Sequence, residues 1–288
     1  MTAVAFDRRL TPARPDLAAE HLRGTVDAPR YAAPTALAVI APLADMHPAP
    51  GVDGPPDTQL VLGERVAAYE IGEAWVWAQA AADGYVGYLA RSALGQPGPE
   101  PTHAVAASHA HVYAEPAVRR SPVARLPWPA RVTMADTVPA TGASRPWARL
   151  AGGGFVPLGQ LAPLDGTAPD WVAVAEARLG TPYRWGGSSG DGIDCSALIQ
   201  RALAAAGIAF PRDSDQQRDH GPLLAPDTPP RRGDLVFWPG HLGVMLDATR
   251  LLHANAFHMA VAAEPLVEAA ARIAAVEGSA ILGLRRLG

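Results

Sequence analysis

The chain has 288 residues, of which 49% are hydrophobic, a formal net charge of −4 and a pI near 6.1. That length and composition support two or three domains with hydrophobic cores and exclude a chain that is disordered throughout. No cluster of Lys and Arg interleaved with aromatic residues provides a basic surface, so a nucleic-acid partner is not expected.

The first 30 residues are predicted to be an arm with little structure of its own that packs on a larger body, because three prolines surround one short amphipathic stretch. Charged residues interrupt this segment before a signal-peptide apolar core could form. No apolar run in the chain approaches the ~20 residues of a membrane span. We therefore expect a cytoplasmic protein with no membrane partner.

Two small β domains are predicted next, at residues 31–95 and 104–165, joined by a linker rich in Pro and Gly. The second is a degenerate repeat of the first, since each has a Trp-containing strand, a Gly-aromatic-Val turn and a closing leucine-rich segment. The expected strands lie at 37–40, 59–62, 65–70, 75–80 and 84–89, and then at 110–113, 131–133, 147–150 and 154–158.

Residues 168–288 add helices to the pattern. Asp170 can cap a helix over 171–179 that Gly180 ends, and a longer helix is predicted over 194–206 before Gly207. Helices followed by antiparallel strands indicate an α+β domain. Its remaining elements are predicted as strands at 234–238, 242–246, 250–254 and 280–286 and a helix at 264–274.

Cys195 is the only cysteine, and it stands where a glycine-rich turn enters the predicted helix 194–206. Unpaired N–H groups and the positive end of the helix dipole favour a thiolate at this position, and the thiolate is the nucleophilic form. A buried structural cysteine that behaves as a small hydrophobic side chain is the alternative.

Two histidines support the catalytic interpretation. His241 opens one predicted strand and His253 lies in the next, after a short turn. If Leu246 pairs with Arg250, then Gly243 faces His253, and the two histidines become diagonal neighbours on one face of the sheet. One imidazole could then take the thiol proton while the other orients it. Each histidine alone would be read as a half-exposed strand residue.

A metal site is the main alternative, because Cys195, His241, His253 and His258 are all suitable zinc ligands. The chain has no second cysteine and no helical His-x-x-x-His pair, so we expect neither metal nor other cofactor. His109 and His111 share a strand face in the second β domain but have no third ligand nearby.

Four segments in order resemble the NlpC/P60 family of cysteine peptidases, and the two β domains resemble bacterial SH3 domains. The resemblance implies a papain-like α+β fold that hydrolyses the bond between γ-D-glutamate and lysine or meso-diaminopimelate in murein stem peptides. The four segments are LGTPYRWGG at 179–187, IDCS at 193–196, RGDLVFW at 232–238 and HLGVM at 241–245.

The resemblance also implies roles for individual residues. Cys195 is the nucleophile, His241 the base and His253 its orienting partner, while the Tyr183 hydroxyl supports the oxyanion. Tyr183 could instead be a packed aromatic side chain whose hydroxyl has no catalytic role. Ala197 stands where the family motif has glycine. We expect this change to be tolerated, because alanine adds only one methyl group.

Relatives with SH3 domains use the first barrel to select peptides with a free N-terminal L-alanine. By that match Glu64, Tyr85 and Asp194 grip the substrate ammonium group. Ser196, Trp185 and Ser214 line the same subsite. Glu64 could instead be a solvated strand-end carboxylate, and Asp194 could be only a helix cap.

These implications favour a cytoplasmic murein-peptide hydrolase in cell-wall recycling. An exported wall-remodelling endopeptidase and a catalytically inert wall-peptide binding protein are the alternatives. The sequence does not decide between lysine and diaminopimelate, between tri- and tetrapeptides, what the second SH3-like domain binds, or the oligomeric state.

Overall fold

The computed structural model describes residues 6–51, 54–139, 145–165 and 170–287. The polypeptide forms two compact units, residues 1–166 and 167–288. The boundary predicted at residue 168 falls outside the described residues. In the described part of the chain, no helix is long and apolar enough to cross a membrane.

The N-terminal arm has more structure than predicted. Leu17 and Ala19 are buried in one cluster with Tyr69, Trp77 and Val86 of the first β domain, so the arm is anchored by apolar packing. Its elements are β1 (Ala13–Arg14), β2 (Leu17–Ala19), the 3-10 helix η1 (Glu20–Leu22) and β3 (Tyr31–Ala32), and the three strands form one small sheet.

The first β domain is a seven-stranded sheet that closes around a core of small and branched side chains. The predicted strands are present, with two additions, β5 and β10. Asp45 and His47 obscure the apolar alternation of β5. The strands in spatial order are β10 (Leu94–Gly95), β4 (Thr35–Val39), β7 (Arg65–Ile71), β8 (Trp75–Ala80), β9 (Val86–Ala90), β5 (Leu43–His47) and β6 (Thr58–Val61), with the 3-10 helix η2 (Arg91–Ala93) before β10.

The second β domain repeats the last part of the first. In each, a Trp-containing strand leads through a glycine with positive φ, Gly84 or Gly154, into a strand, a 3-10 helix and a short closing strand. Four strands were not predicted: β11, β13, β15 and β18. The elements are β11 (His103–Val105), β12 (His109–Val112), β13 (Ala124–Pro127), β14 (Arg131–Val132), β15 (Met134–Val138), β16 (Trp147–Leu150), β17 (Phe155–Pro157), η3 (Leu158–Gln160) and β18 (Leu161–Pro163).

The 167–288 unit is the predicted α+β domain, built on a five-stranded antiparallel sheet. Asp170 caps α1 through its carboxylate, as expected. The helices are α1 (Trp171–Glu176), α2 (Cys195–Ala205), α3 (Ser214–Gln217) and α4 (Leu266–Glu277). The sheet order is β24 (Ala260–Pro265), β23 (Arg250–Asn255), β22 (His241–Met245), β21 (Asp234–Trp238) and β25 (Gly283–Arg286), and a separate pair is β19 (Ser188–Ser189) and β20 (Gly192–Ile193).

One of the boundaries that were predicted wrongly bears on the site. The helix predicted over 264–274 starts at Leu266, and Glu264 belongs to strand β24, where it lies opposite Leu251 of β23. Pro265 explains the difference, because a residue that precedes proline is disfavoured in helical conformation. Glu264 therefore projects from the sheet rather than from a helix.

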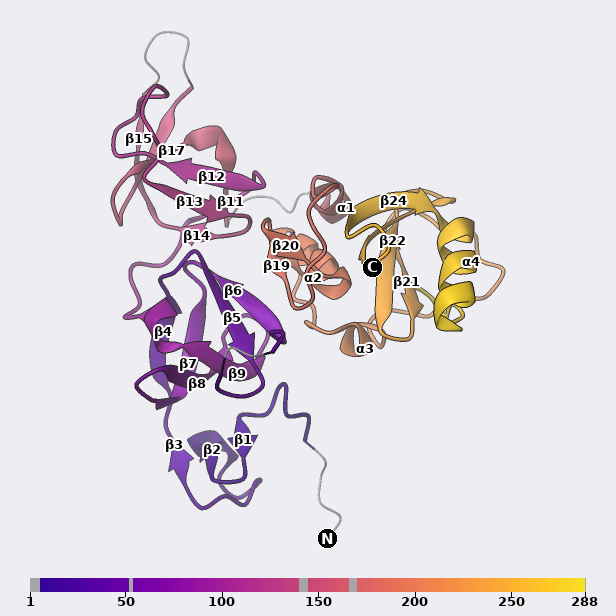
Figure 1. The fold of residues 1–288 in the computed structure, drawn as a ribbon, viewed down its shortest axis with the longest axis horizontal. Helices are drawn as coiled ribbons and strands as arrows, with labels where there is room; N and C mark the ends of the chain where they lie inside the picture. Colours follow the sequence, from indigo (N-terminus) through magenta and orange to yellow (C-terminus); the bar gives the residue numbers. More distant parts are fainter. Residues whose placement is uncertain (1–5, 52–53, 140–144, 166–169, 288) are drawn as a thin grey trace. The chain divides into compact units, whose positions relative to one another are not determined.

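The two long helices lie on opposite sides of this sheet (Figure 1). Helix α4 buries Ala269 and Ile273 against one face of the sheet, which contributes Val236, Trp238 and Met245. Helix α2 packs along β22 and β23 and is buried over most of its length. The start of α2 is thereby fixed beside β22.

The strand register agrees with the prediction for the histidines. The Leu246 N–H donates to the carbonyl of Arg250 at 2.8 Å, and Val244 pairs with Leu252, so Gly243 lies opposite His253. A Cβ added at Gly243 would stand 3.0 Å from the His253 Cβ and 2.9 Å from the Leu252 carbonyl oxygen. The glycine therefore permits the close approach of β23.

We expect Gly243→Ala to lower the free energy of unfolding by about 1–3 kcal/mol, because the added methyl group overpacks this strand pair. Thermal or urea unfolding measures the change. Gly159→Ala is the matched control, since its Cβ would meet nothing within 4 Å. Equal destabilisation by both variants would contradict the packing argument.

Candidate active site

Cys195 is the first residue of α2 and is buried. Burial, together with the neighbouring carboxylate of Asp194, raises the pKa of the thiol to about 12, although the backbone N–H groups of Leu242 and Ser196 at the sulfur lower it. The expected thiolate-stabilising effect of the helix start is therefore outweighed by burial and by the Asp194 carboxylate. With its pKa raised, the thiol needs a base to remove its proton before the sulfur can act as a nucleophile.

His241 and His253 meet across β22 and β23. Their Nε2 and Nδ1 atoms, respectively, are 2.8 Å apart, which is hydrogen-bond distance. His253 is fully buried, and burial lowers its pKa. Burial, followed by the charge of His253, lowers the pKa of His241 to about 3, so this imidazole is neutral and able to accept a proton.

Glu264 and Arg272 extend this pair, and neither was predicted from the sequence. The His253 Nε2 lies 2.7 Å from Glu264 Oε1, and both guanidinium terminal nitrogens of Arg272 donate to the carboxylate at 2.6 Å. Burial opposes ionisation of Glu264, but these hydrogen bonds hold its pKa at about 2. Glu264 reaches His253 because it lies in strand β24 and not in the helix that was predicted over 264–274.

Tyr183 lies within electrostatic reach of Cys195. Burial, and then the charges of Cys195 and Asp194, raise the pKa of its phenol, so the hydroxyl keeps its proton. Its backbone N–H donates to the carbonyl of Met259, which fixes the segment. A neutral hydroxyl at this place can donate a hydrogen bond to an oxyanion.

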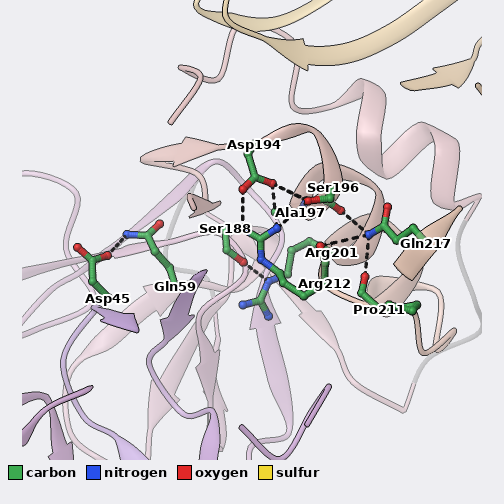
Figure 2. A network of polar contacts seen from close by, with 10 residues as sticks. All are labelled: Asp45, Gln59, Ser188, Asp194, Ser196, Ala197, Arg201, Pro211, Arg212 and Gln217. Carbon is green, nitrogen blue, oxygen red and sulfur yellow. Dashed lines mark hydrogen bonds and ion pairs between the residues drawn. The ribbon is translucent and has the colours of Figure 1, made fainter. Parts of the chain in front are cut away.

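Asp194 is the N-cap of α2 and also half of a buried ion pair (Figure 2). Its Oδ1 accepts from the Ala197 N–H at 2.8 Å, and Arg212 donates to both carboxylate oxygens at 3.0 and 2.6 Å. Arg212, which is 1% exposed, also donates to the Ser196 hydroxyl. Arg212 was not predicted as a partner of Asp194, because no local pattern in the sequence reveals a distant partner.

The other predicted subsite residues are distributed over both units. Trp185 is 65% exposed, and Ser214 begins α3. Glu64 and Tyr85 belong to the 1–166 unit, where both are buried. Glu64 accepts a hydrogen bond from the Val61 N–H and borders a pocket of about 320 Å³ within that unit. The joint action of Glu64, Tyr85 and Asp194 on a substrate stays a prediction.

One group of possible metal ligands exists among the described residues: His253, His258 and Glu264, with ligand atoms within 4.8 Å of one another. This group differs from the candidate zinc ligands considered from the sequence, which were Cys195, His241, His253 and His258. His253 and Arg272 already use the Glu264 carboxylate, and the Arg272 cation opposes a metal ion there. This arrangement fits a hydrogen-bonded chain better than a metal site.

Two family models match the chain. Residues 180–273 match the NlpC/P60 family, and residues 46–94 match the bacterial dipeptidyl-peptidase SH3 domain. The chain thus contains an NlpC/P60 domain and an SH3 domain of that type. The resemblance and the α+β fold class inferred from the sequence are confirmed.

Curated relatives match a part of the chain. Dipeptidyl-peptidase 6 from Lysinibacillus sphaericus is 37% identical over 84 residues, which are 29% of this chain and 31% of the relative. The γ-D-glutamyl-L-lysine dipeptidyl-peptidase from Bacillus subtilis is 34% identical over 96 residues, 31% of this chain and 32% of the relative. A probable endopeptidase from Mycobacterium tuberculosis is 36% identical over 110 residues, 35% of this chain and 28% of the relative. The matches thus span about a third or less of these proteins.

A solved structure shares the fold over most of the chain. The NlpC/P60 family protein from Bacillus cereus ATCC 10987 superimposes with a TM-score of 0.71 at 20% identity, covering 88% of this chain and 99% of the other.

The raised thiol pKa predicts the alkylation behaviour of Cys195. We expect the rate of modification by iodoacetamide to keep rising from about pH 6 to about pH 9, because the reactive thiolate fraction grows until the pH reaches the thiol pKa. Intact-protein mass spectrometry follows the reaction without ambiguity, since the chain has no other cysteine. A rate that is already constant below about pH 7 would show a preformed thiolate instead.

Proposed function

We propose that this chain, with its NlpC/P60 domain, is a cysteine peptidase that cleaves murein stem peptides between γ-D-glutamate and the diamino acid. The proposal is carried by the histidine pair at 2.8 Å and by the lone cysteine at the start of α2. The cysteine sulfur accepts a hydrogen bond from the N–H of Leu242, the residue that follows His241. The SH3 domain of dipeptidyl-peptidase type and the relative named for γ-D-glutamyl-L-lysine support the substrate class.

The reaction proceeds through an acyl-enzyme. His241 takes the thiol proton as the Cys195 sulfur attacks the γ-carbonyl carbon, and the oxyanion forms near the Tyr183 hydroxyl. The carbon–nitrogen bond then breaks, and protonated His241 gives its proton to the leaving amine. Water next attacks the thioester while His241 accepts one of its protons, and that proton returns to the departing sulfur. The chemistry uses side chains of the 167–288 unit alone.

The proposal includes a preference for peptides with a free N-terminal L-alanine. Asp194, Glu64 and Tyr85 supply two carboxylates and a phenol, which are acceptors for the three N–H donors of an ammonium group. Ser196, Trp185 and Ser214 line the same subsite in this proposal. Such a preference suits small released peptides, and we therefore place the enzyme in peptide recycling in the cytoplasm.

Product analysis by mass spectrometry tests the proposed reaction. We expect L-Ala-γ-D-Glu to be released from L-Ala-γ-D-Glu-meso-diaminopimelate, with the rate reduced at least about 1000-fold in Cys195→Ala. Intact sacculi are the comparison substrate, and their cleavage would favour wall remodelling over recycling. Absence of cleavage of either substrate would leave the binding-protein alternative.

Acetylation of the substrate's N-terminus tests the specificity. Loss of charge-assisted hydrogen bonds to the ammonium group is expected to lower kcat/KM by about 10- to 100-fold. Glu64→Gln should lower kcat/KM for the free peptide and change that for the acetylated peptide much less. Equal kcat/KM values for free and acetylated peptides in the wild-type protein would contradict the assigned subsite.

A further inference from the structure

His253, the second histidine of the pair, is hydrogen-bonded to the carboxylate of Glu264, and two hydrogen bonds from Arg272 hold that carboxylate in place. Arg272 donates Nη1 to Oε2 and Nη2 to Oε1 of Glu264, both at 2.6 Å, which is a bidentate pair. The same Oε1 lies 2.7 Å from the His253 Nε2. Arg272 itself comes from α4, whereas Glu264 and His253 come from neighbouring strands.

The surroundings of the Glu264–Arg272 ion pair leave few other hydrogen-bond partners for the Glu264 carboxylate. His253 is fully buried, and the Glu264 side chain is 9% exposed. The Arg272 guanidinium lies 4.1 Å from the centre of the Phe257 ring, which covers it. His258 is the other titratable group nearby, but its Nδ1 is 3.8 Å from Glu264 Oε1 and 3.1 Å from Asn255 Oδ1. Glu264 therefore bonds to His253 and Arg272 in preference to His258.

The direction of each hydrogen bond follows from the carboxylate. An ionised carboxylate only accepts, so the His253 Nε2 must carry a hydrogen and donate it. In a neutral ring the Nδ1 of His253 is then an acceptor, and His241 must donate to it from Nε2. That leaves the Nδ1 of His241 without a proton, which is the state that a base for the Cys195 thiol requires.

Without Glu264 the direction could reverse. His253 could then donate from Nδ1 to the Nε2 of His241, which would place the His241 proton on Nδ1. In that tautomer the His241 nitrogen that is not bonded to His253 carries a hydrogen and cannot accept one. The rings would still be in contact, but the base would be disabled.

We propose that Glu264, held by Arg272, is a positioning residue that sets the tautomers of both histidines, so that His241 presents an unprotonated Nδ1 for the thiol proton. The catalytic consequence rests on the proposed function, whereas the tautomer assignment does not. Among the described residues Glu264 makes no hydrogen bond to Cys195 or His241, and its hydrogen bond to the histidine pair is to His253.

Long-range ¹H–¹⁵N correlation spectra of the ¹⁵N-labelled full chain test the assignment directly, because they show which ring nitrogen carries the hydrogen. At neutral pH we expect His241 and His253 both to be protonated on Nε2. In Glu264→Leu, which removes the acceptor, both rings should populate the Nδ1-protonated tautomer. A wild-type His253 protonated on Nδ1 would overturn the proposal, whatever the activity of the protein.

Kinetics supply the second readout. Glu264→Leu should lower kcat about 10- to 100-fold while KM changes less than about threefold, because substrate contacts remain. Glu73→Leu, an exposed change of the same kind in the 1–166 unit, is the matched control and should leave spectra and kcat unchanged. Unchanged tautomers together with an unchanged kcat in Glu264→Leu would also overturn the proposal.

A second variant tests the proposal if Glu264→Leu does not fold. Glu264→Gln keeps the side-chain shape, but its amide can donate as well as accept, so it should permit both tautomers and lower kcat to a smaller extent. Retention of the wild-type tautomers and kcat in this variant would count against the proposal if Glu264→Leu does not fold. If no murein peptide is cleaved, the proposed function fails and the spectra still decide on Glu264.

Discussion

The hydrogen bond between His241 and His253 is the interaction on which the rest of the site depends. It exists because β22 and β23 pair in a register that places Gly243 opposite His253, so that the two imidazoles meet diagonally across a position without a side chain. A shift by one residue would turn one histidine to the other face of the sheet. The short turn after β22 and the tight packing around Gly243 therefore determine the contact between the two imidazoles as well as the stability of the sheet.

Two ion pairs hold the ends of the site, and each involves an arginine. Arg272 pairs with Glu264 behind His253, and Arg212 pairs with Asp194, the residue before Cys195. The Asp194 carboxylate raises the pKa of the thiol, and Arg212 counteracts this effect in part. A buried carboxylate that lost its arginine would be an uncompensated charge in a dry environment. The two arginines thus compensate the charges of Asp194 and Glu264, so that both carboxylates can be ionised next to the cysteine and the histidines.

Much of this arrangement could be predicted from local sequence. The N-cap of α2 and the register of the strand pair each follow from patterns within a few residues. The candidate roles of Cys195, His241 and His253 follow from these patterns together with the family resemblance. Glu264 was missed because the alanine-rich stretch was read as one helix, although Pro265 is a local signal that Glu264 lies outside it. Arg212 and Arg272 gave no such signal, since their partners are set by tertiary packing. The arm was underestimated for the same reason: its short strands are stabilised by burial against Trp77 and Tyr69.

The central claim is that Cys195 forms a covalent acyl-enzyme with His241 as its base. The most direct measurement is acid quenching during the first turnovers on the murein tripeptide, followed by mass spectrometry of the peptide that contains residue 195. The account predicts a thioester-linked L-Ala-γ-D-Glu on Cys195, absent in His241→Ala. Product formation by the wild-type protein with Cys195 unmodified at every quench time would contradict it.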